Sequence, residues 1–86
     1  MRLSLDYDGT YTRDPVMWDA FIASAKGAGH EVICVTMRFP DEERIDMPVE
    51  VVYTSRQAKA PHMAALGRVP DIWIDDNPKW IYSGAA

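Results

Sequence analysis

Four short apolar segments, each of strand length, alternate with helical or irregular stretches, and this alternation limits the possible folds most. The segments span residues 2–5, 31–35, 49–53 and 71–75. Strands that alternate with helices form right-handed βαβ units, whose strands are parallel and whose helices cover both faces of the sheet. The sequence therefore predicts an α/β fold, a small Rossmann-like three-layer sandwich with a mostly parallel sheet of about four strands.

The connections between these segments differ in how clearly they predict helices. Asp14-Pro15 supplies an N-cap and a first-turn proline, and apolar residues then recur at helical spacing up to Gly27. Residues 60–67 predict a second, short helix that starts near Pro61. Residues 41–46 have room for only one or two helical turns. We therefore expect the second connection to be short or irregular.

Length and composition narrow the class of protein. With 86 residues we expect one domain, spanning residues 1–86. A chain of this size buries only ~60% of its unfolded surface, so a bound ion or a homo-oligomer is one way to add stability. The formal charge of −4 argues against an extended nucleic-acid surface. The chain has no apolar run of the ~20 residues that a membrane span needs and no signal-peptide pattern, which predicts a cytoplasmic protein without membrane contact.

Polar side chains follow the ends of the predicted strands. In chain order these are Asp6, Asp8, Thr36, Ser55, Lys59, Asp75 and Asp76. The carboxyl ends of parallel strands meet at one edge of the sheet, which is where α/β proteins bind their ligands. Four carboxylates at that edge need a compensating cation, and oxygen ligands favour a hard ion such as Mg²⁺. The lysine and the threonine suit an anionic substrate, so the set indicates phosphoryl transfer.

Four segments, taken together and in order, resemble the four signatures of haloacid dehalogenase (HAD) phosphatases. Residues 3–10 run from an apolar strand into Asp-x-Asp-Gly-Thr, and residues 32–38 form an apolar strand that ends in Thr-Met-Arg. Residues 59–61 place a lysine beside a helix start, and residues 72–78 place Asp-Asp-Asn-Pro after a strand. The resemblance spans residues 3–78 and implies a HAD-like fold and a phosphoric monoester hydrolase.

The resemblance also implies a role for each matching residue. Asp6 would attack phosphorus and become an aspartyl phosphate, and Asp8 would be the general acid and base. Mg²⁺ would be bound by Asp6, by the backbone carbonyl of Asp8 and by Asp75, with Asp76 in an outer or water-linked position. Thr36 and Lys59 would hold the phosphoryl oxygens. Arg38, Tyr11 and Trp80 are further candidates for contact with the substrate.

One departure from the family concerns the cap domain. Most HAD phosphatases carry a cap inserted after the first motif or between the second and third, but residues 10–14 and 38–49 are too short for one. We therefore expect a capless, open site. Its phosphorylated substrate could be a small molecule or the end of a macromolecule, and a large substrate, a partner chain or an oligomer could complete the site.

Several other interpretations compete with a phosphatase. Asp8-Gly9 could form a two-residue hairpin turn. A phospho-acceptor receiver domain also gathers acids, threonine and lysine at a sheet edge, but it places its acceptor aspartate on a middle strand, where this chain has Thr36 and Ser55. The main alternative is a catalytically idle HAD-like module that binds a phosphorylated ligand or a protein partner. The lone Cys34 lies in an apolar run and predicts a buried, inert thiol.

Overall fold

The computed structural model describes residues 1–85 and contains one four-stranded, all-parallel sheet with the strand order β3-β2-β1-β4. The strands are β1 (Arg2–Leu5), β2 (Glu31–Thr36), β3 (Glu50–Tyr53) and β4 (Ile72–Ile74). All four lie within about one residue of the predicted segments. The predicted α/β class and the parallel sheet are confirmed.

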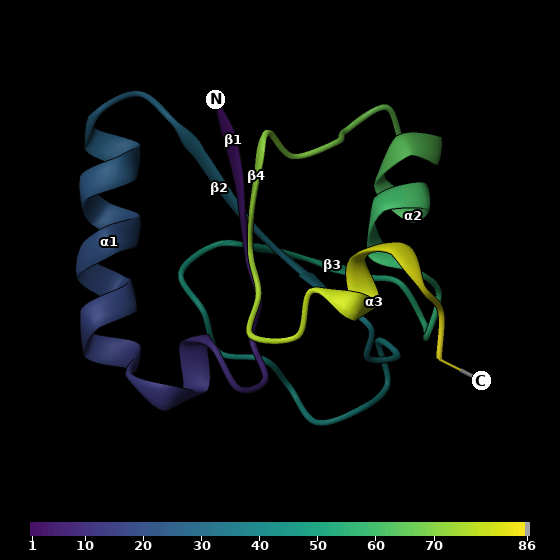
Figure 1. Ribbon diagram of the computed structural model, residues 1–86. Helices are drawn as coiled ribbons and strands as arrows, with labels where there is room; N and C mark the ends of the chain where they lie inside the picture. The colour runs from purple at the N-terminus through teal and green to yellow at the C-terminus, as the bar shows by residue number, and fades with distance from the viewer. Residues whose placement is uncertain (86) are drawn as a thin grey trace.

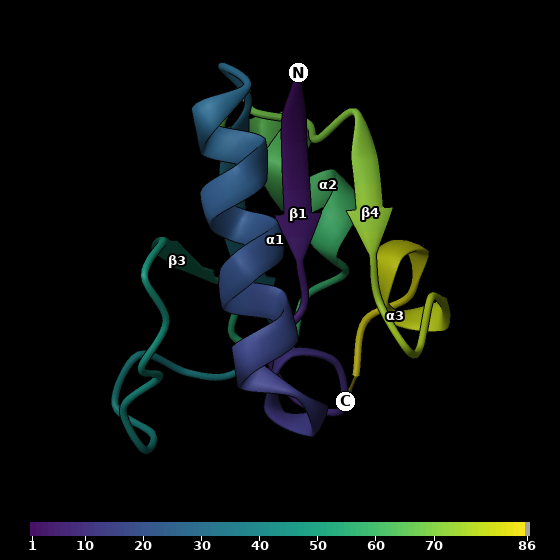
Figure 2. The same ribbon diagram turned by 90° about the vertical axis from the view of Figure 1, so that its left-hand side faces the viewer.

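Helices cover both faces of this sheet. The helices are α1 (Pro15–Gly27), α2 (Lys59–Ala65) and α3 (Lys79–Tyr82), and a single 3-10 turn, η1 (Tyr11–Arg13), precedes α1. In Figure 1 the strands are seen nearly on edge, with α1 on one side and α2 and α3 on the other. Figure 2 shows α1 in front of the sheet, and β1 and β4 point toward the same end of the molecule. The predicted three layers are therefore present.

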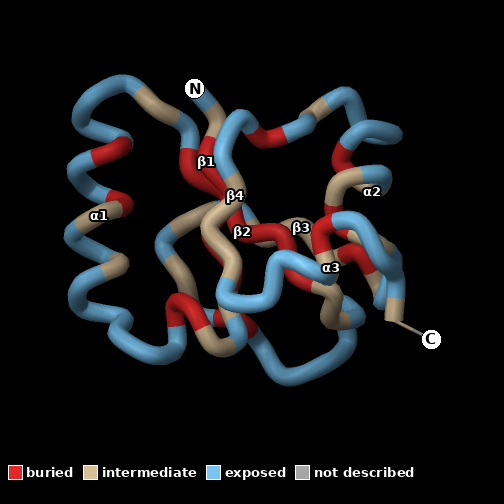
Figure 3. The backbone as a smooth tube through the Cα atoms, in the orientation of Figure 1, coloured by how far each residue is buried: buried red, intermediate tan, exposed pale blue. Residues whose placement is uncertain are grey.

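Local sequence signals explain where α1 begins and what it covers. The Asp14 carboxylate accepts a hydrogen bond from the backbone N–H of Met17 at 3.1 Å, and Pro15 follows at the first helical position. The inner face of α1 packs Ile22 and Ala25 against a buried cluster that includes Leu5. In Figure 3 the buried positions follow the central strands and the inner side of this helix.

The opposite face of the sheet has a smaller core. Ile33 and Val35 of β2 pack there against Met63 of α2, and all three are almost fully buried. Cys34 is also fully buried and unpaired, and burial raises the pKa of its thiol to about 12. The predicted burial of Cys34 is confirmed.

Three further details of the chain path complete the fold. Residues 41–46 form no helix, so the second connection is irregular, as expected. Residues 79–82 form the short helix α3. The Asp8-Gly9 hairpin is excluded, because β1 pairs only with the parallel strands β2 and β4.

Among residues 1–85, no helix is both long and apolar enough to cross a membrane.

Candidate active site

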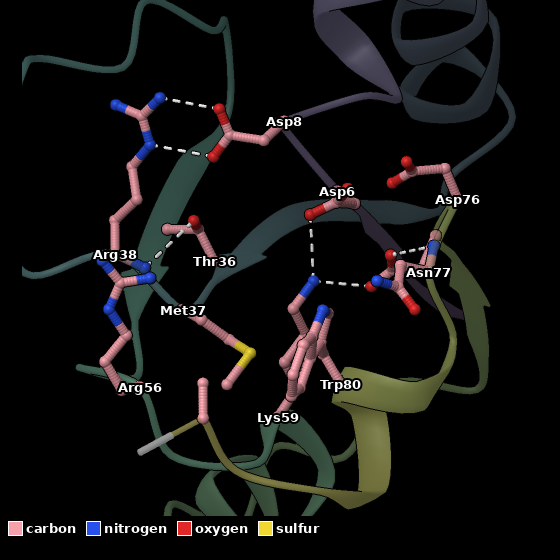
Figure 4. A pocket seen from close by; sticks show the side chains of 12 residues that line it. Asp6, Asp8, Thr36, Met37, Arg38, Arg56, Lys59, Asp76, Asn77 and Trp80 are labelled. Atoms are coloured by element: carbon pink, nitrogen blue, oxygen red, sulfur yellow. Dashed lines mark hydrogen bonds and ion pairs between the residues drawn. The ribbon is translucent and has the colours of Figure 1, made fainter.

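The carboxyl edge of the sheet holds a pocket of about 320 Å³. Seven of its lining residues are the site residues predicted from the sequence: Asp6, Asp8, Thr36, Arg38, Lys59, Asp75 and Asp76. The other five are Met37, Arg56, Asn77, Trp80 and Ala85. Most of these side chains are drawn in Figure 4. The fold therefore brings together residues from four separate segments of the chain.

Lys59 lies at the centre of the pocket and bridges two carboxylates. Its Nζ lies 2.9 Å from Asp6 Oδ1 and 2.6 Å from Asp75 Oδ2, and only 3% of the residue is exposed (Figure 4). The first turn of α2 delivers the lysine, whereas the acids follow β1 and β4. Because a buried ammonium needs a charged partner, this arrangement fixes the positions of all three side chains.

Burial and neighbouring charges shift the pKa values of Asp6 and Lys59 in opposite directions. Burial raises the pKa of Asp6 to about 6, although Lys59 lowers it through its charge and hydrogen bond. Burial lowers the pKa of Lys59, but the carboxylates of Asp6 and Asp75 outweigh burial and hold it above its ordinary value. The lysine is therefore charged, and the aspartate titrates closer to neutral pH than an exposed one.

Thr10 links Asp6 to the second acid of the pair after β4. Its hydroxyl lies 3.1 Å from Asp6 Oδ2 and 3.2 Å from Asp76 Oδ1, and it accepts a hydrogen bond from the Asp76 backbone N–H at 3.1 Å. Thr10 is buried. It therefore holds the β1 and β4 ends of the site in a fixed relation.

Gly9 allows the segment after β1 to lie close to Asp76. Its φ of +79° is favoured only by glycine, and a Cβ atom at this position would lie 2.9 Å from Asp76 Cγ and closer still to Oδ2. Position 9 therefore has two separate reasons to be glycine: its backbone conformation and the side chain of Asp76.

Replacing Gly9 by Ala should destabilise the protein more than the same change at Gly29. Gly29 also has a positive φ, of +87°, but within residues 1–85 no atom beyond its chain neighbours lies within 4 Å of its added Cβ. We expect a loss of about 1–2 kcal/mol for Gly29→Ala from the backbone alone. In Gly9→Ala the added Cβ should also push the exposed Asp76 carboxylate away from the Thr10 hydroxyl, and the lost hydrogen bond should add roughly 0.5–1.5 kcal/mol. Urea unfolding of both variants measures the difference, and equal losses would contradict the close approach.

Three carboxylates could hold a metal ion together. Oxygen atoms of Asp6, Asp75 and Asp76 all lie within 4.8 Å of one another. A set made only of carboxylate oxygens suits Mg²⁺ and does not favour softer ions. The residues present therefore fit the predicted ion.

Asp8 points away from this cluster. Its two oxygens accept hydrogen bonds from Arg38 Nε at 2.9 Å and Nη2 at 2.6 Å, a bidentate pair (Figure 4). The Arg38 guanidinium also lies 5.3 Å from the centre of the Tyr7 ring. Arg38 is thus at the pocket, as predicted, but it binds a carboxylate of the protein itself.

The remaining candidates are divided between the pocket and the core. Thr36 is buried at the end of β2, where its hydroxyl accepts a 3.4 Å hydrogen bond from the Arg38 N–H. Trp80 lines the pocket from α3. Tyr11 does not, because its ring is buried and its hydroxyl donates to Asp19 at 2.7 Å. Tyr11 therefore lies outside the pocket, unlike the other two candidates, Arg38 and Trp80.

The sequence patterns do not mark Thr10 or Arg56 as site residues. In the sequence, Thr10 is only the last residue of Asp-x-Asp-Gly-Thr, and Arg56 is only a positive charge near Lys59. The positions of Thr10 and Arg56 at the site follow from contacts between residues that are distant in the sequence.

No protein-family model, curated protein or solved structure gives a significant match to this chain. The residues of the pocket are therefore the basis for assigning a function to the chain.

Proposed function

We propose that this chain is a Mg²⁺-dependent phosphate monoester hydrolase with Asp6 as its nucleophile. The main support is the buried ion-pair cluster in which Lys59 contacts Asp6 and Asp75, beside Asp76, in a pocket at the carboxyl edge of a parallel sheet. We also propose that the chain is a capless member of the HAD phosphatases. In support, all four matching segments contribute residues to this one pocket.

Asp6 and Asp8 would divide the reaction into two steps. An Asp6 oxygen attacks phosphorus, the bond from phosphorus to the leaving oxygen breaks, and Asp8 donates a proton to that oxygen. Asp8 then removes a proton from the water that attacks phosphorus. The bond to Asp6 breaks, and inorganic phosphate leaves with the Asp6 carboxylate restored.

Lys59 and Thr36 would bind the phosphoryl oxygens during both steps. The Lys59 ammonium offsets the charge of Asp6, so that an anionic ester can approach an anionic nucleophile. Asp6, Asp75 and Asp76 would hold the magnesium ion, which when bound neutralises charge on the transferring group.

Asp8 has to leave Arg38 before it can serve as acid and base. Its side chain is 56% exposed, so rotation away from the guanidinium meets little packing resistance. The Arg38 side chain is only 23% exposed and the pair is bidentate, so this exchange of partners costs more than breaking an ordinary surface ion pair.

The same pair favours a second candidate function. A catalytically idle module that binds a phosphorylated ligand or partner would retain the Lys59 cluster and leave Asp8 permanently bound to Arg38. Turnover distinguishes the two functions.

Wild-type protein should release inorganic phosphate from 4-nitrophenyl phosphate and from a panel of small phosphate esters when Mg²⁺ is present. Release should stop with a chelator and return when Mg²⁺ is restored. Mass spectrometry of acid-quenched enzyme should detect a covalent phosphoryl group on the peptide that contains Asp6. Folded protein that binds Mg²⁺ but releases no phosphate from any ester would favour the idle module.

A further inference from the structure

We propose that Arg56 binds a second anionic group of the substrate, a phosphate or a carboxylate, while Lys59 holds the reacting phosphoryl group. This inference rests on the proposed function and adds a substrate class to it. The substrate would be a small phosphate ester with two anionic ends.

The backbone around Arg56 is strained. Ser55 and Arg56 have φ values of +52° and +71°, and they are the non-glycine residues with positive φ among residues 1–85. Each such residue costs on the order of 1–3 kcal/mol and persists only where its surroundings enforce it. Two in succession, beside a pocket, mark a turn that the fold maintains at the expense of stability.

Hydrogen bonds from both flanking segments hold this turn in place. The Ser55 N–H donates to the Arg38 carbonyl at 3.3 Å, and the Arg56 N–H donates to the Met37 carbonyl at 2.8 Å. The Arg56 carbonyl accepts from the Ala85 N–H at 2.9 Å. A Cβ atom on Gly84 would lie 3.3 Å from that carbonyl oxygen. Residues 84 and 85 therefore pack against the turn and hold the backbone of Arg56 in position.

Among the cations that line the pocket, Arg56 has the weakest contacts with carboxylates. Lys59 and Arg38 contact pocket carboxylates at 2.6–2.9 Å. Within residues 1–85, the ion pair of Arg56 is a 3.7 Å contact with Glu42, outside the pocket, and the Arg56 side chain is 49% exposed. Its guanidinium also lies 5.8 Å from the Phe39 ring centre. A guanidinium in this state remains able to bind a phosphate or carboxylate through two hydrogen bonds.

The shape of the pocket separates the two anion positions. In Figure 4, Arg56 lies on the same side as Arg38 and Thr36, with Lys59 between it and Asp76. A volume of about 320 Å³ lies at the lower end of small-ligand pockets, which are ~300–1,000 Å³. The pocket therefore has room for a short ester whose far end reaches Arg56.

Binding of non-hydrolysable phosphonates tests this inference directly. Calorimetry in the presence of Mg²⁺ compares propylphosphonate, which has one anionic group, with 3-phosphonopropanoate and propane-1,3-bisphosphonate, which have two. Wild type should bind at least one two-anion probe roughly tenfold more tightly than propylphosphonate, the gain expected for a charge-assisted hydrogen bond that is partly exposed. Which probe shows the larger gain tells carboxylate from phosphate.

The key variant is Arg56→Asn, because asparagine tolerates a positive φ and replaces the cationic side chain with a shorter, neutral polar one. Its affinity ratio between two-anion and one-anion probes should fall to about one. The ratio should persist in Arg44→Asn, an exposed arginine outside the pocket, and in Ser55→Gly, which relieves one strained residue and keeps Arg56.

A wild-type ratio near one, or a ratio unchanged in Arg56→Asn, would overturn this inference even if the protein hydrolyses phosphate esters. Conversely, a protein without hydrolytic activity whose two-anion preference depends on Arg56 would support the inference and reject only the proposed function.

Discussion

Asp6→Asn should abolish magnesium-dependent phosphate release, with a loss on the order of 10⁴-fold or more, the scale seen when an enzyme loses its nucleophile. An amide oxygen cannot attack phosphorus to form a stable acyl phosphate, and Asn also removes one of the three proposed metal ligands. Initial rates at saturating Mg²⁺ measure the loss, and the covalent phosphoryl group should disappear with them.

The same substitution should stabilise the metal-free protein near neutral pH. Because burial raises the pKa of Asp6 from 3.8 to about 6, the folded state binds its proton more tightly than the unfolded chain. The stability that this proton contributes is fully present below pH 3.8 and is lost as the pH rises through about 6. Above that range the ionised carboxylate destabilises the folded state. We therefore expect Asp6→Asn to raise the free energy of unfolding by roughly 1–2 kcal/mol.

Urea unfolding with a chelator, at pH values between about 4 and 8, measures this effect. The stability difference between Asp6→Asn and wild type should grow through that range and level off near its upper end. Asp41→Asn, the same chemical change on an exposed aspartate in the irregular second connection, should change neither activity nor the pH profile. A variant that loses stability equally at every pH would show that Asp6 is not a strained ionised group in the folded state.

The sequence predicted correctly that these polar side chains gather at one edge of the sheet, because its strands are short and polar residues follow their ends. Thr36, Asp6 and Asp75 reach one edge simply because β1, β2 and β4 are parallel. Lys59 follows, since α2 begins within a few residues of the end of β3. Strand pattern and topology are enough for this level of detail.

The partners of individual side chains could not be predicted in the same way. Thr10 and Asp76 are 66 positions apart, and their contact depends on the positive φ of Gly9, which lets the two segments approach. The Asp8–Arg38 pair depends on the path of an irregular loop that has no periodic pattern to read. Sequence patterns identify residues at an edge, but side-chain geometry within that edge arises from tertiary contacts.

The place of Arg56 illustrates the same limit. Two consecutive non-glycine residues with positive φ contradict local propensity, so no turn signal in Thr54-Ser55-Arg56-Gln57 predicts them. The conformation follows from hydrogen bonds to the Met37 and Arg38 carbonyls, which belong to another segment. Such failures of local prediction are expected at functional sites.

Lys59→Met should produce the largest loss of stability of any substitution considered, about 3–5 kcal/mol near neutral pH. Methionine fills a similar volume but removes the only cation in contact, within residues 1–85, with the carboxylates of Asp6 and Asp75. Both side chains are at most 10% exposed, so water solvates them poorly. Since small domains have total stabilities of about 5–15 kcal/mol, the variant should be close to unfolding.

Two comparisons make this prediction specific. Lys79→Met, a change at an exposed lysine over the Trp80 ring, should cost less than about 1 kcal/mol. The double variant Asp6→Asn/Lys59→Met should be more stable than Lys59→Met alone, because it leaves one buried carboxylate in place of two. The wild type, Asp6→Asn, Lys59→Met and the double variant form a double-mutant cycle, and denaturant unfolding measures the stability of each. Additive changes in the free energy of unfolding would contradict direct coupling between Lys59 and Asp6.

Magnesium offers a further check on what the lysine does. If Lys59 balances the charge of a metal-binding acidic cluster, Mg²⁺ should raise the melting temperature of Lys59→Met by more than that of wild type, because the ion then supplies the missing positive charge. Calorimetric scans over a range of Mg²⁺ concentrations measure the two shifts. An equal shift would mean that the ion binds without replacing the charge of Lys59, and no shift in the variant would mean that the three carboxylates do not bind the ion without the lysine.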